Sequence, residues 1–202
     1  MLNAVNLQIQ GGDWLWLTGS SGAGKTTLVH ALIGAVELTD GDILVDGYNI
    51  TKFNRLALQE YRRRLGIVFQ DYKLLPKKTV YENVAFAMEV CGYGEKQIEE
   101  KVPEVLEKVG LSQARHHFPY QLSGGEKQRA AIARALIHQP RLIIADEPTG
   151  NLDPTTATEI VHLFQKLHVE GATVIFATHN LSLIDHFKKR RIHIEDGQVQ
   201  VT

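Results

Sequence analysis

The sequence lacks a second cysteine, a long apolar run and any large excess of one charge. The single Cys91 excludes an intramolecular disulfide and is typical of proteins in reducing compartments. A membrane span needs about 20 mostly apolar residues, which no segment supplies, and no N-terminal basic-then-apolar segment predicts a signal peptide. We therefore expect a cytoplasmic protein that reaches the inner face of the cell membrane only through a partner.

The balance of charge limits the kinds of partner that we expect, and the chain length limits the number of domains. Twenty-two basic residues stand against 23 acidic ones, which gives a net charge of -1 and no overall attraction for nucleic acid. No nucleic-acid partner is expected. A chain of 202 residues forms one domain, or one domain with a subdomain.

One glycine-rich segment fits the phosphate-binding pattern G-x-x-x-x-G-K-[ST]. Glycines let such a loop turn tightly and bring its backbone N–H groups close to an anion. Lys25 supplies a mobile charge for the outer phosphates, and the Thr26 hydroxyl can complete a Mg²⁺ shell. The predicted nucleotide-binding residues are Gly19, Ser20, Ser21, Gly22, Ala23, Gly24, Lys25, Thr26 and Thr27.

The neighbours of this loop favour phosphate binding over the alternative, an ordinary glycine-rich turn. An apolar run at residues 14–17 is short enough for a buried strand, and residues 26–33 are typical of a helix that ends at Gly34. This order places the loop at a helix N-terminus, which is itself an anion site. The segment therefore predicts a nucleoside triphosphate site.

Apolar runs alternate with helical periodicity along the chain, which predicts an α/β fold with a mostly parallel sheet. Strands are expected at residues 4–10, 14–17, 41–47, 65–69, 142–145 and 173–177, with a closing hairpin at 192–194 and 198–201. Residues 71–136 carry only helical patterns, with capping boxes at Thr79 and Ser123. The basic residues 62–64 are expected to form a solvated helix end.

Polar residues follow three of the predicted strands. Asp146 and Glu147 end a fully apolar strand, where open α/β sheets bind ligands and where a buried carboxylate needs a partner such as a metal. Asp146 can hold Mg²⁺, and Glu147 can orient or deprotonate an attacking water. Gln70 and His179 end two other strands and can reach the metal, the water or the terminal phosphate.

Residues 122–126, Leu-Ser-Gly-Gly-Glu, predict a second anion site. A capping box explains Ser123 and Glu126, but Gly124 and Gly125 are poor helix formers that a cap does not require. They make sense if something approaches that helix N-terminus closely. Two such helix ends in one chain can serve one nucleotide only across a dimer.

In this order the motifs resemble the nucleotide-binding domain of ATP-binding cassette (ABC) proteins, over nearly the whole chain. Residues 19–27 resemble Walker A, residues 142–146 Walker B, and residues 122–126 the signature motif. The resemblance implies a P-loop NTPase fold with a RecA-like, mostly parallel sheet, a helical signature subdomain and an incomplete N-terminal antiparallel β subdomain. It divides a single domain, 1–202, into an α/β core at 1–70 and 137–202 and a helical subdomain at 71–136.

The same resemblance implies a Mg²⁺-dependent ATPase that acts as a head-to-tail dimer. Glu147, His179 and Gln70 are then catalytic, and Thr26, Gln70 and Asp146 hold the Mg²⁺. The second copy contributes Ser123, Gly124, Gly125 and Asp153 to the nucleotide. Hydrolysis moves an integral membrane partner.

Residues 69–84 are similar to the cell-division branch of this family, in its Gram-positive form. There the resemblance makes Tyr72, Leu74, Leu75 and Tyr81 candidates for the groove that receives the membrane partner; alternatively they fill the core of the helical subdomain. Residues 146–153 are shared with lipoprotein-releasing and macrolide-exporter ATPases, so an exporter is the second interpretation. A soluble ABC ATPase acting on DNA or ribosomes is disfavoured by the short spacing between Lys25 and Ser123, which leaves no room for a coiled coil.

The chain departs from the family at its start. Members usually have upstream strands and an aromatic residue that stacks on adenine, whereas Trp14 and Trp16 belong to the strand before the loop. We expect weaker nucleotide binding than in a chain extended upstream, and calorimetry on the two chains tests this.

Overall fold

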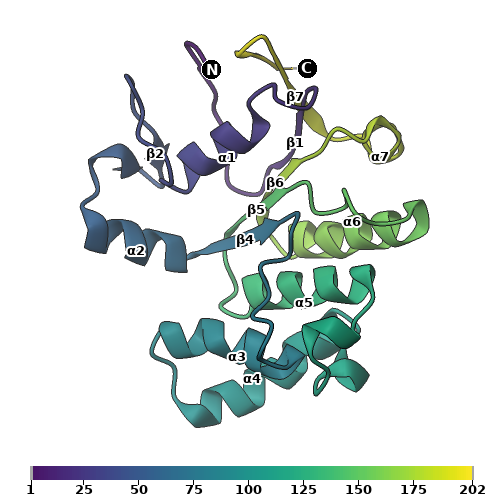
Figure 1. Ribbon diagram of the computed structural model, residues 1–202. Helices are drawn as coiled ribbons and strands as arrows, with labels where there is room; N and C mark the ends of the chain where they lie inside the picture. Colours follow the sequence, from purple (N-terminus) through teal and green to yellow (C-terminus); the bar gives the residue numbers. More distant parts are fainter. Residues whose placement is uncertain (1, 202) are drawn as a thin grey trace.

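A six-stranded sheet runs through the molecule and separates two groups of helices (Figure 1). The computed structural model describes residues 2–201. In spatial order the strands are β4 (Leu65–Phe69), β5 (Leu142–Asp146), β6 (Thr173–Ala177), β1 (Trp14–Thr18), β7 (Arg190–Glu195) and β8 (Gln198–Val201). All neighbours pair in parallel except β7 and β8, which form the predicted antiparallel hairpin.

The apolar runs form central strands because both of their faces are covered. Along β1, Trp14 and Trp16 join one core cluster, and Leu15 and Leu17 join the cluster on the opposite face. All five residues of β1 are buried, which is the pattern of a parallel strand between two layers of helices. The sheet therefore holds the carboxyl ends of its strands at one edge with little freedom.

The helices divide between the two faces of the sheet. α1 (Lys25–Leu32) and α2 (Arg55–Arg63) contribute to the core cluster of one face, together with Leu15 and Leu17. The other face is covered by α5 (Gly124–Leu136), α6 (Pro154–Val169) and α7 (Leu181–His186), and α3 (Val80–Val90) and α4 (Glu95–Lys108) pack on α5 beyond it (Figure 1). Short 3₁₀ helices lie at Ile50–Lys52, Ser112–Ala114 and Pro119–Gln121.

Both predicted capping boxes are confirmed. The Thr79 side chain caps α3 while its own N–H donates to Glu82 Oε2 at 2.7 Å. Ser123 and Glu126 cap α5 in the same way, with 2.8 Å between the Ser123 nitrogen and Glu126 Oε2. The N-termini of these helices are therefore set by residues local in sequence.

The predicted strand at residues 4–10 is wrong. Leu7 and Ile9 are half-buried against the core, as the alternation indicated, but the segment forms no ladder with another strand. Both neighbours of β1 are already β6 and β7, and the described backbone hydrogen bonds of residues 4–10 are isolated ones, such as Asp13 N–H to Gln10 O at 3.1 Å. The small antiparallel sheet is instead made by β2 (Leu44–Val45) and β3 (Tyr48–Asn49), which confirms only the centre of the predicted strand at 41–47.

The basic cluster at the end of α2 is only partly a solvated helix end. Arg63 and Arg64 pair with Glu60 at the surface, whereas the half-buried Arg62 donates to Ile33 O at 2.9 Å and Gly34 O at 2.6 Å. These carbonyls follow α1 and have no partner within that helix. Arg62 therefore ties α2 to the end of the helix that begins at the glycine-rich loop.

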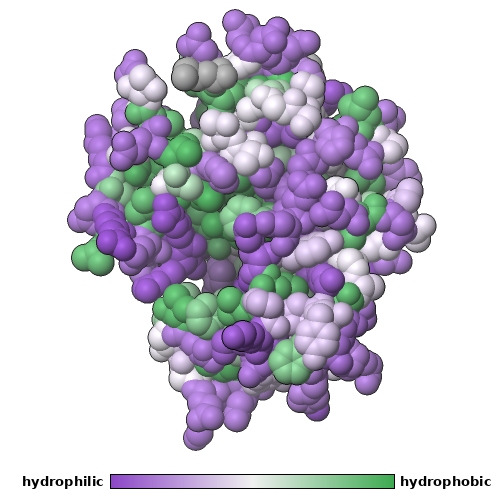
Figure 2. Space-filling view, in the orientation of Figure 1, coloured by the Kyte–Doolittle hydropathy of each residue, from purple (hydrophilic) through white to green (hydrophobic). Residues whose placement is uncertain are grey.

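The surface is mainly polar. On the face drawn in Figure 2 polar side chains predominate and apolar ones form separate patches. Within residues 2–201, no helix combines the length and apolar character that a membrane span requires.

Candidate functional site

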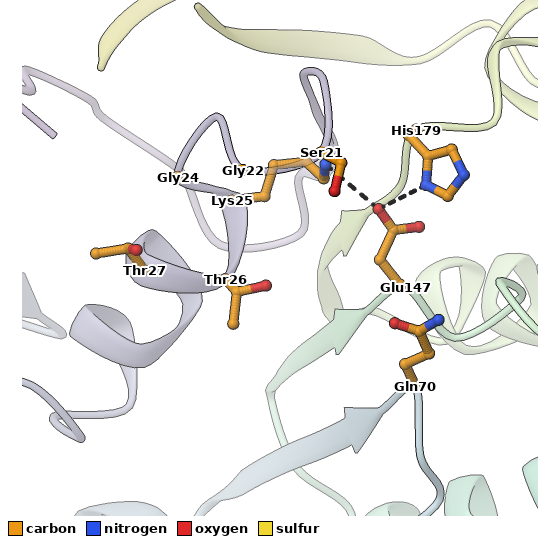
Figure 3. Close-up of a pocket in the computed structure, with 9 residues that line it drawn as sticks. All are labelled: Ser21, Gly22, Gly24, Lys25, Thr26, Thr27, Gln70, Glu147 and His179. Atoms are coloured by element: carbon orange, nitrogen blue, oxygen red, sulfur yellow. Dashed lines mark hydrogen bonds and ion pairs between the residues drawn. The ribbon is translucent and has the colours of Figure 1, made fainter. Parts of the chain in front are cut away.

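Four parallel strands end at one edge of the sheet, and polar residues from each surround a cavity of about 390 Å³ (Figure 3). The glycine-rich loop follows β1, Gln70 follows β4, Glu147 follows β5 and His179 follows β6. The cavity is lined by Ser21, Gly22, Gly24, Lys25, Thr26, Thr27, Gln70, Glu147 and His179. The structure thus brings together residues that lie more than 150 positions apart.

The loop curls over the N-terminus of α1, which begins at Lys25. Gly19, Gly22 and Gly24 adopt φ values of 150°, 80° and 116°, which side-chain-bearing residues rarely reach. A Cβ on Gly19 would also lie 2.5 Å from Ile194 O in β7, so this glycine is required by close packing as well. The first turn of α1 therefore faces the cavity with N–H groups suited to an anion.

Lys25 is buried and folds back over the loop. Its Nζ donates to Gly19 O at 2.9 Å and to Ser20 O at 3.1 Å, and it lies 3.4 Å from Glu147 Oε1. Figure 3 shows this ion pair crossing the cavity from the loop to the end of β5. The lysine is therefore held by weak partners that a more highly charged anion can replace.

Glu147 is held in the cavity by its backbone and by two neighbouring side chains. Its backbone has φ 48°, a strained conformation for a residue with a side chain, and its N–H donates to Ala177 O at 2.9 Å. His179 Nδ1 lies 3.0 Å from the same Oε1 that contacts Lys25. The other oxygen, Oε2, is buried and has no hydrogen-bond partner among the described residues. The residues around it therefore leave one carboxylate oxygen free for a water or a cation.

Asp146 is the last residue of β5, directly before Glu147 in sequence, and is 7% exposed. Burial raises the pKa of this carboxyl and the neighbouring Glu147 adds to the effect, while contact with Thr26 and the charges of His30 and Lys25 act in the opposite direction. Its Oδ1 is buried without a hydrogen-bond partner among residues 2–201. The unpartnered Asp146 oxygen, on a carboxyl that contacts Thr26, offers an oxygen ligand of the kind that suits a hard cation such as Mg²⁺.

Asp146→Asn is expected to stabilise the nucleotide-free protein at neutral pH by about 1 kcal/mol, or ~2–4 °C in Tm. Because the pKa is raised on folding, the unfavourable contribution is absent at pH well below the ordinary value of 3.8 and complete above the raised value. The wild-type protein therefore becomes less stable as the pH rises through that window, because Asp146 ionises, and the variant does not. Thermal unfolding at several pH values tests this; a variant less stable than wild type at pH 7 contradicts it.

The residues predicted to act from a second copy do not line the cavity of their own chain. Ser123 caps α5, and Gly124 and Gly125 form its first turn. Asp153 caps α6 by accepting from the N–H groups of Thr155 and Thr156, both at 3.0 Å. These two helix N-termini lie side by side, because a Cβ on Gly125 would be 2.7 Å from Thr156 Cγ2. Part of the close approach inferred from the two glycines is therefore made by the chain's own α6.

Gly125→Ala is expected to destabilise the protein by about 1–3 kcal/mol, because the added methyl overlaps a helix neighbour. Adding Thr156→Ser removes Cγ2 and should restore most of the loss. Gly11→Ala serves as the control for replacing a glycine without steric overlap, since nothing lies within 4 Å of its Cβ position and its φ is not in the left-handed region. Urea unfolding measures all three; no recovery in the double variant contradicts the packing explanation.

The groove candidates occupy the segment after β4 and the start of α3. Tyr72, Leu74, Leu75 and Tyr81 are all half-buried. Leu74 and Tyr81 pack against the larger core cluster, which agrees with the alternative that these residues fill the core of the helical subdomain. Both also keep part of their side chains at the surface.

Sequence reasoning missed what holds Gln70. Asn151 Nδ2 donates to Gln70 O at 3.4 Å, and a Cβ on Gly150 would lie 2.9 Å from Gln70 Nε2. The glycine at position 150, shortly after Asp146 and Glu147, was the feature of the sequence that could have indicated a close approach by another side chain.

A buried lysine that follows a glycine-rich loop after β1, and faces a carboxylate just beyond the end of the parallel strand β5, is typical of the class of P-loop nucleotide-binding proteins. Within that class, the family model described as ABC transporter matches residues 2–150, and the chain belongs to this family.

Relatives refine the assignment and confirm the predicted resemblance. The chain is 46% identical to the cell division ATP-binding protein FtsE of Streptococcus pneumoniae, covering 98% of this chain and 86% of that protein. FtsE of Bacillus subtilis is 44% identical over 97% of the chain and 86% of its own length, and FtsE of Escherichia coli 40% identical over 98% and 89%.

Solved structures confirm the predicted fold class. The ATP-binding cassette MJ0796, described as a dimer in a post-hydrolysis state bound to ADP and Pi, superimposes with a TM-score of 0.89 at 34% identity, covering 98% of this chain and 88% of that one. CbiO1 of Clostridium perfringens matches with a TM-score of 0.90 at 32% identity, covering 98% and 80%.

Proposed function

We propose that this chain is the ATP-hydrolysing subunit of an FtsE-type ABC complex. It partners an integral membrane protein resembling FtsX and couples ATP hydrolysis to cell division and septal cell-wall hydrolysis. The observation that carries the cell-division assignment is the 40–46% identity to FtsE proteins of several bacteria over nearly the whole chain. The relatives do not favour the lipoprotein-releasing or macrolide-type exporter, which would differ only in the membrane partner.

The cavity accounts for how ATP is held. Its phosphates lie over the N-terminus of α1 and the amides of residues 19–24, and Lys25 exchanges its carbonyl partners and Glu147 for the outer phosphates. Thr26, Gln70 and Asp146 would hold Mg²⁺, for which the unpartnered Asp146 oxygen is a fitting ligand. Bound there, the ion supplies neutralisation of the phosphate charge.

Glu147 acts as the base. Once Lys25 moves to the phosphates, the carboxylate is free to accept a proton from a water aimed at the terminal phosphorus. His179 contacts Glu147 at 3.0 Å and keeps its orientation, while most of its ring is exposed on the cavity side, where it can donate to the terminal phosphate. Gln70 orients the water from the end of β4.

The active form is a head-to-tail dimer. Ser123, Gly124, Gly125 and Asp153 lie outside the cavity of their own chain, so they reach a nucleotide only in a second copy. The dimer described for MJ0796, at 34–35% identity, supports this arrangement.

Capture of the partner tests the proposal. Glu147→Gln with ATP should hold the dimer closed on its partner in solubilised membranes, and the same variant carrying Lys25→Ala is the matched control. A small membrane protein with few spans, together with cell-wall hydrolase or division components, is the expected result. A large permease with an extracellular substrate domain would instead make the chain an exporter subunit, and capture of no membrane protein would overturn both assignments.

A further inference from the structure

The backbone just beyond Gln70 makes a turn that two ordinary residues do not favour. Tyr72 and Lys73 have φ values of 60° and 51°, in the left-handed region that residues with a Cβ rarely occupy. Two such residues in succession persist only where the surrounding structure holds them. The turn separates Gln70, in the cavity, from the helices of the 71–136 segment.

One side chain of the helical segment binds this turn. Arg134, in the last turns of α5, donates through Nη1 to Lys73 O and through Nη2 to Tyr72 O, at 2.5 and 2.9 Å. The two fixed N–H directions of a guanidinium match two successive carbonyls of a turn. Burial lowers the pKa of Arg134, and within residues 2–201 no carboxylate lies within ion-pair distance of it. The carbonyls are therefore its main described partners.

The same helix also touches Tyr72 near its beginning. A Cβ on Gly124 would lie 3.5 Å from Tyr72 Oη, so the tyrosine extends along α5 from the Arg134 contact toward the signature residues. On the other side, Asn151 donates to Gln70 O. Gln70 is thus held between the segment after β5 and a turn fastened to α5.

The chain that follows the turn is anchored separately, at Leu75. Asn83 is fully buried in α3; its Oδ1 accepts from Leu75 N–H at 2.7 Å and its Nδ2 donates to the carbonyls of Leu75, Lys78 and Thr79. Only Leu74 lies between the two anchors, so residues 72–75 are fastened both to α5 and to α3.

We infer that Arg134 is a positioning residue for the reaction, which fastens the 70–73 turn to the signature helix and so sets the place of the Gln70 amide in the cavity. The role of Arg134 in hydrolysis rests on the proposed function. The fastening of the turn rests only on the two hydrogen bonds from Arg134.

Arg134→Gln and Arg134→Lys test the inference, with Arg129→Lys as the matched control. Arg129 lies on the same helix and also uses its guanidinium on a backbone carbonyl and a neighbour, Val109 O at 3.2 Å and Glu159 Oε2 at 2.7 Å, but it is remote from the turn. Arg134→Lys keeps the charge and serves if Arg134→Gln fails to fold. In nucleotide-free protein, both Arg134 variants should exchange the amides of residues 71–74 about tenfold faster, and the control should not.

In steady-state assays the Arg134 variants should lower kcat for MgATP about tenfold and raise the Mg²⁺ concentration for half-maximal activity, as Gln70→Ala does. Combining Arg134→Gln with Gln70→Ala should cost no more than Gln70→Ala alone, because both act through one side chain. Unchanged exchange, unchanged kcat despite faster exchange, or additive losses would each overturn the positioning role. A wild-type chain that does not hydrolyse MgATP would instead overturn the proposed function, and the exchange result would still decide whether Arg134 holds the turn.

Discussion

Glu147→Gln is expected to lower kcat for ATP hydrolysis by about 10²- to 10³-fold while leaving ATP binding intact. The substitution keeps the size of the side chain and removes its ability to accept a proton. Glu147 is placed for that role by a strained backbone at φ 48°, by His179 at 3.0 Å and by one buried oxygen without a described partner. A side chain that served only to pair with Lys25 would not require this arrangement.

Steady-state phosphate release and a separate binding isotherm measure the two quantities. Glu159→Gln is the matched control, because this glutamate lies on the surface of α6, pairs with Arg129 and is remote from the cavity. It should retain wild-type kcat. Full activity in Glu147→Gln would remove the assignment of the base, whereas loss of both binding and kcat would make the residue structural.

Lys25→Ala is expected to weaken ATP binding about 10²-fold, which corresponds to the loss of one or two hydrogen bonds to a charged group. The ammonium is buried and its present partners are two loop carbonyls and Glu147, so the phosphates gain a donor that is already desolvated and close at hand. No other lysine lines the cavity among the described residues.

Calorimetric or fluorescence titration with ATP tests this second prediction. Lys52→Ala is the control, since that lysine is exposed and only approaches Asp42, at 4.0 Å. Its affinity should equal that of wild type. An unchanged dissociation constant for Lys25→Ala would mean that the phosphates do not reach the loop in the way the cavity indicates.

Much of the candidate site was predictable from sequence because its parts are local. The glycine-rich loop, the carboxylates after β5, and the residues ending β4 and β6 are each recognised within a few positions, and parallel strands necessarily bring their ends to one edge. The capping boxes at Thr79 and Ser123 were likewise predictable, since both partners lie three residues apart.

Errors arose where a pattern depends on a neighbour distant in sequence. The alternation at residues 4–10 indicated the half-burial of Leu7 and Ile9, but a strand also needs a partner, and β6 and β7 already flank β1. Arg62 was expected in solvent from its basic neighbours, yet it reaches carbonyls at the end of α1, about 30 positions earlier.

The sequence by itself determined the class of fold, the phosphate loop, the carboxylate pair and the helix caps, because each is encoded by residue types at short spacings that restrict the backbone directly. Only the tertiary structure decided that Thr156 is what approaches Gly125, that Glu147 holds both Lys25 and His179, and that Arg134 fastens the turn beyond Gln70. The physical reason is that these contacts join elements separated by tens of residues. Their partners are chosen by how the helices pack on the sheet, and that packing minimises the free energy of the whole chain rather than of any one segment.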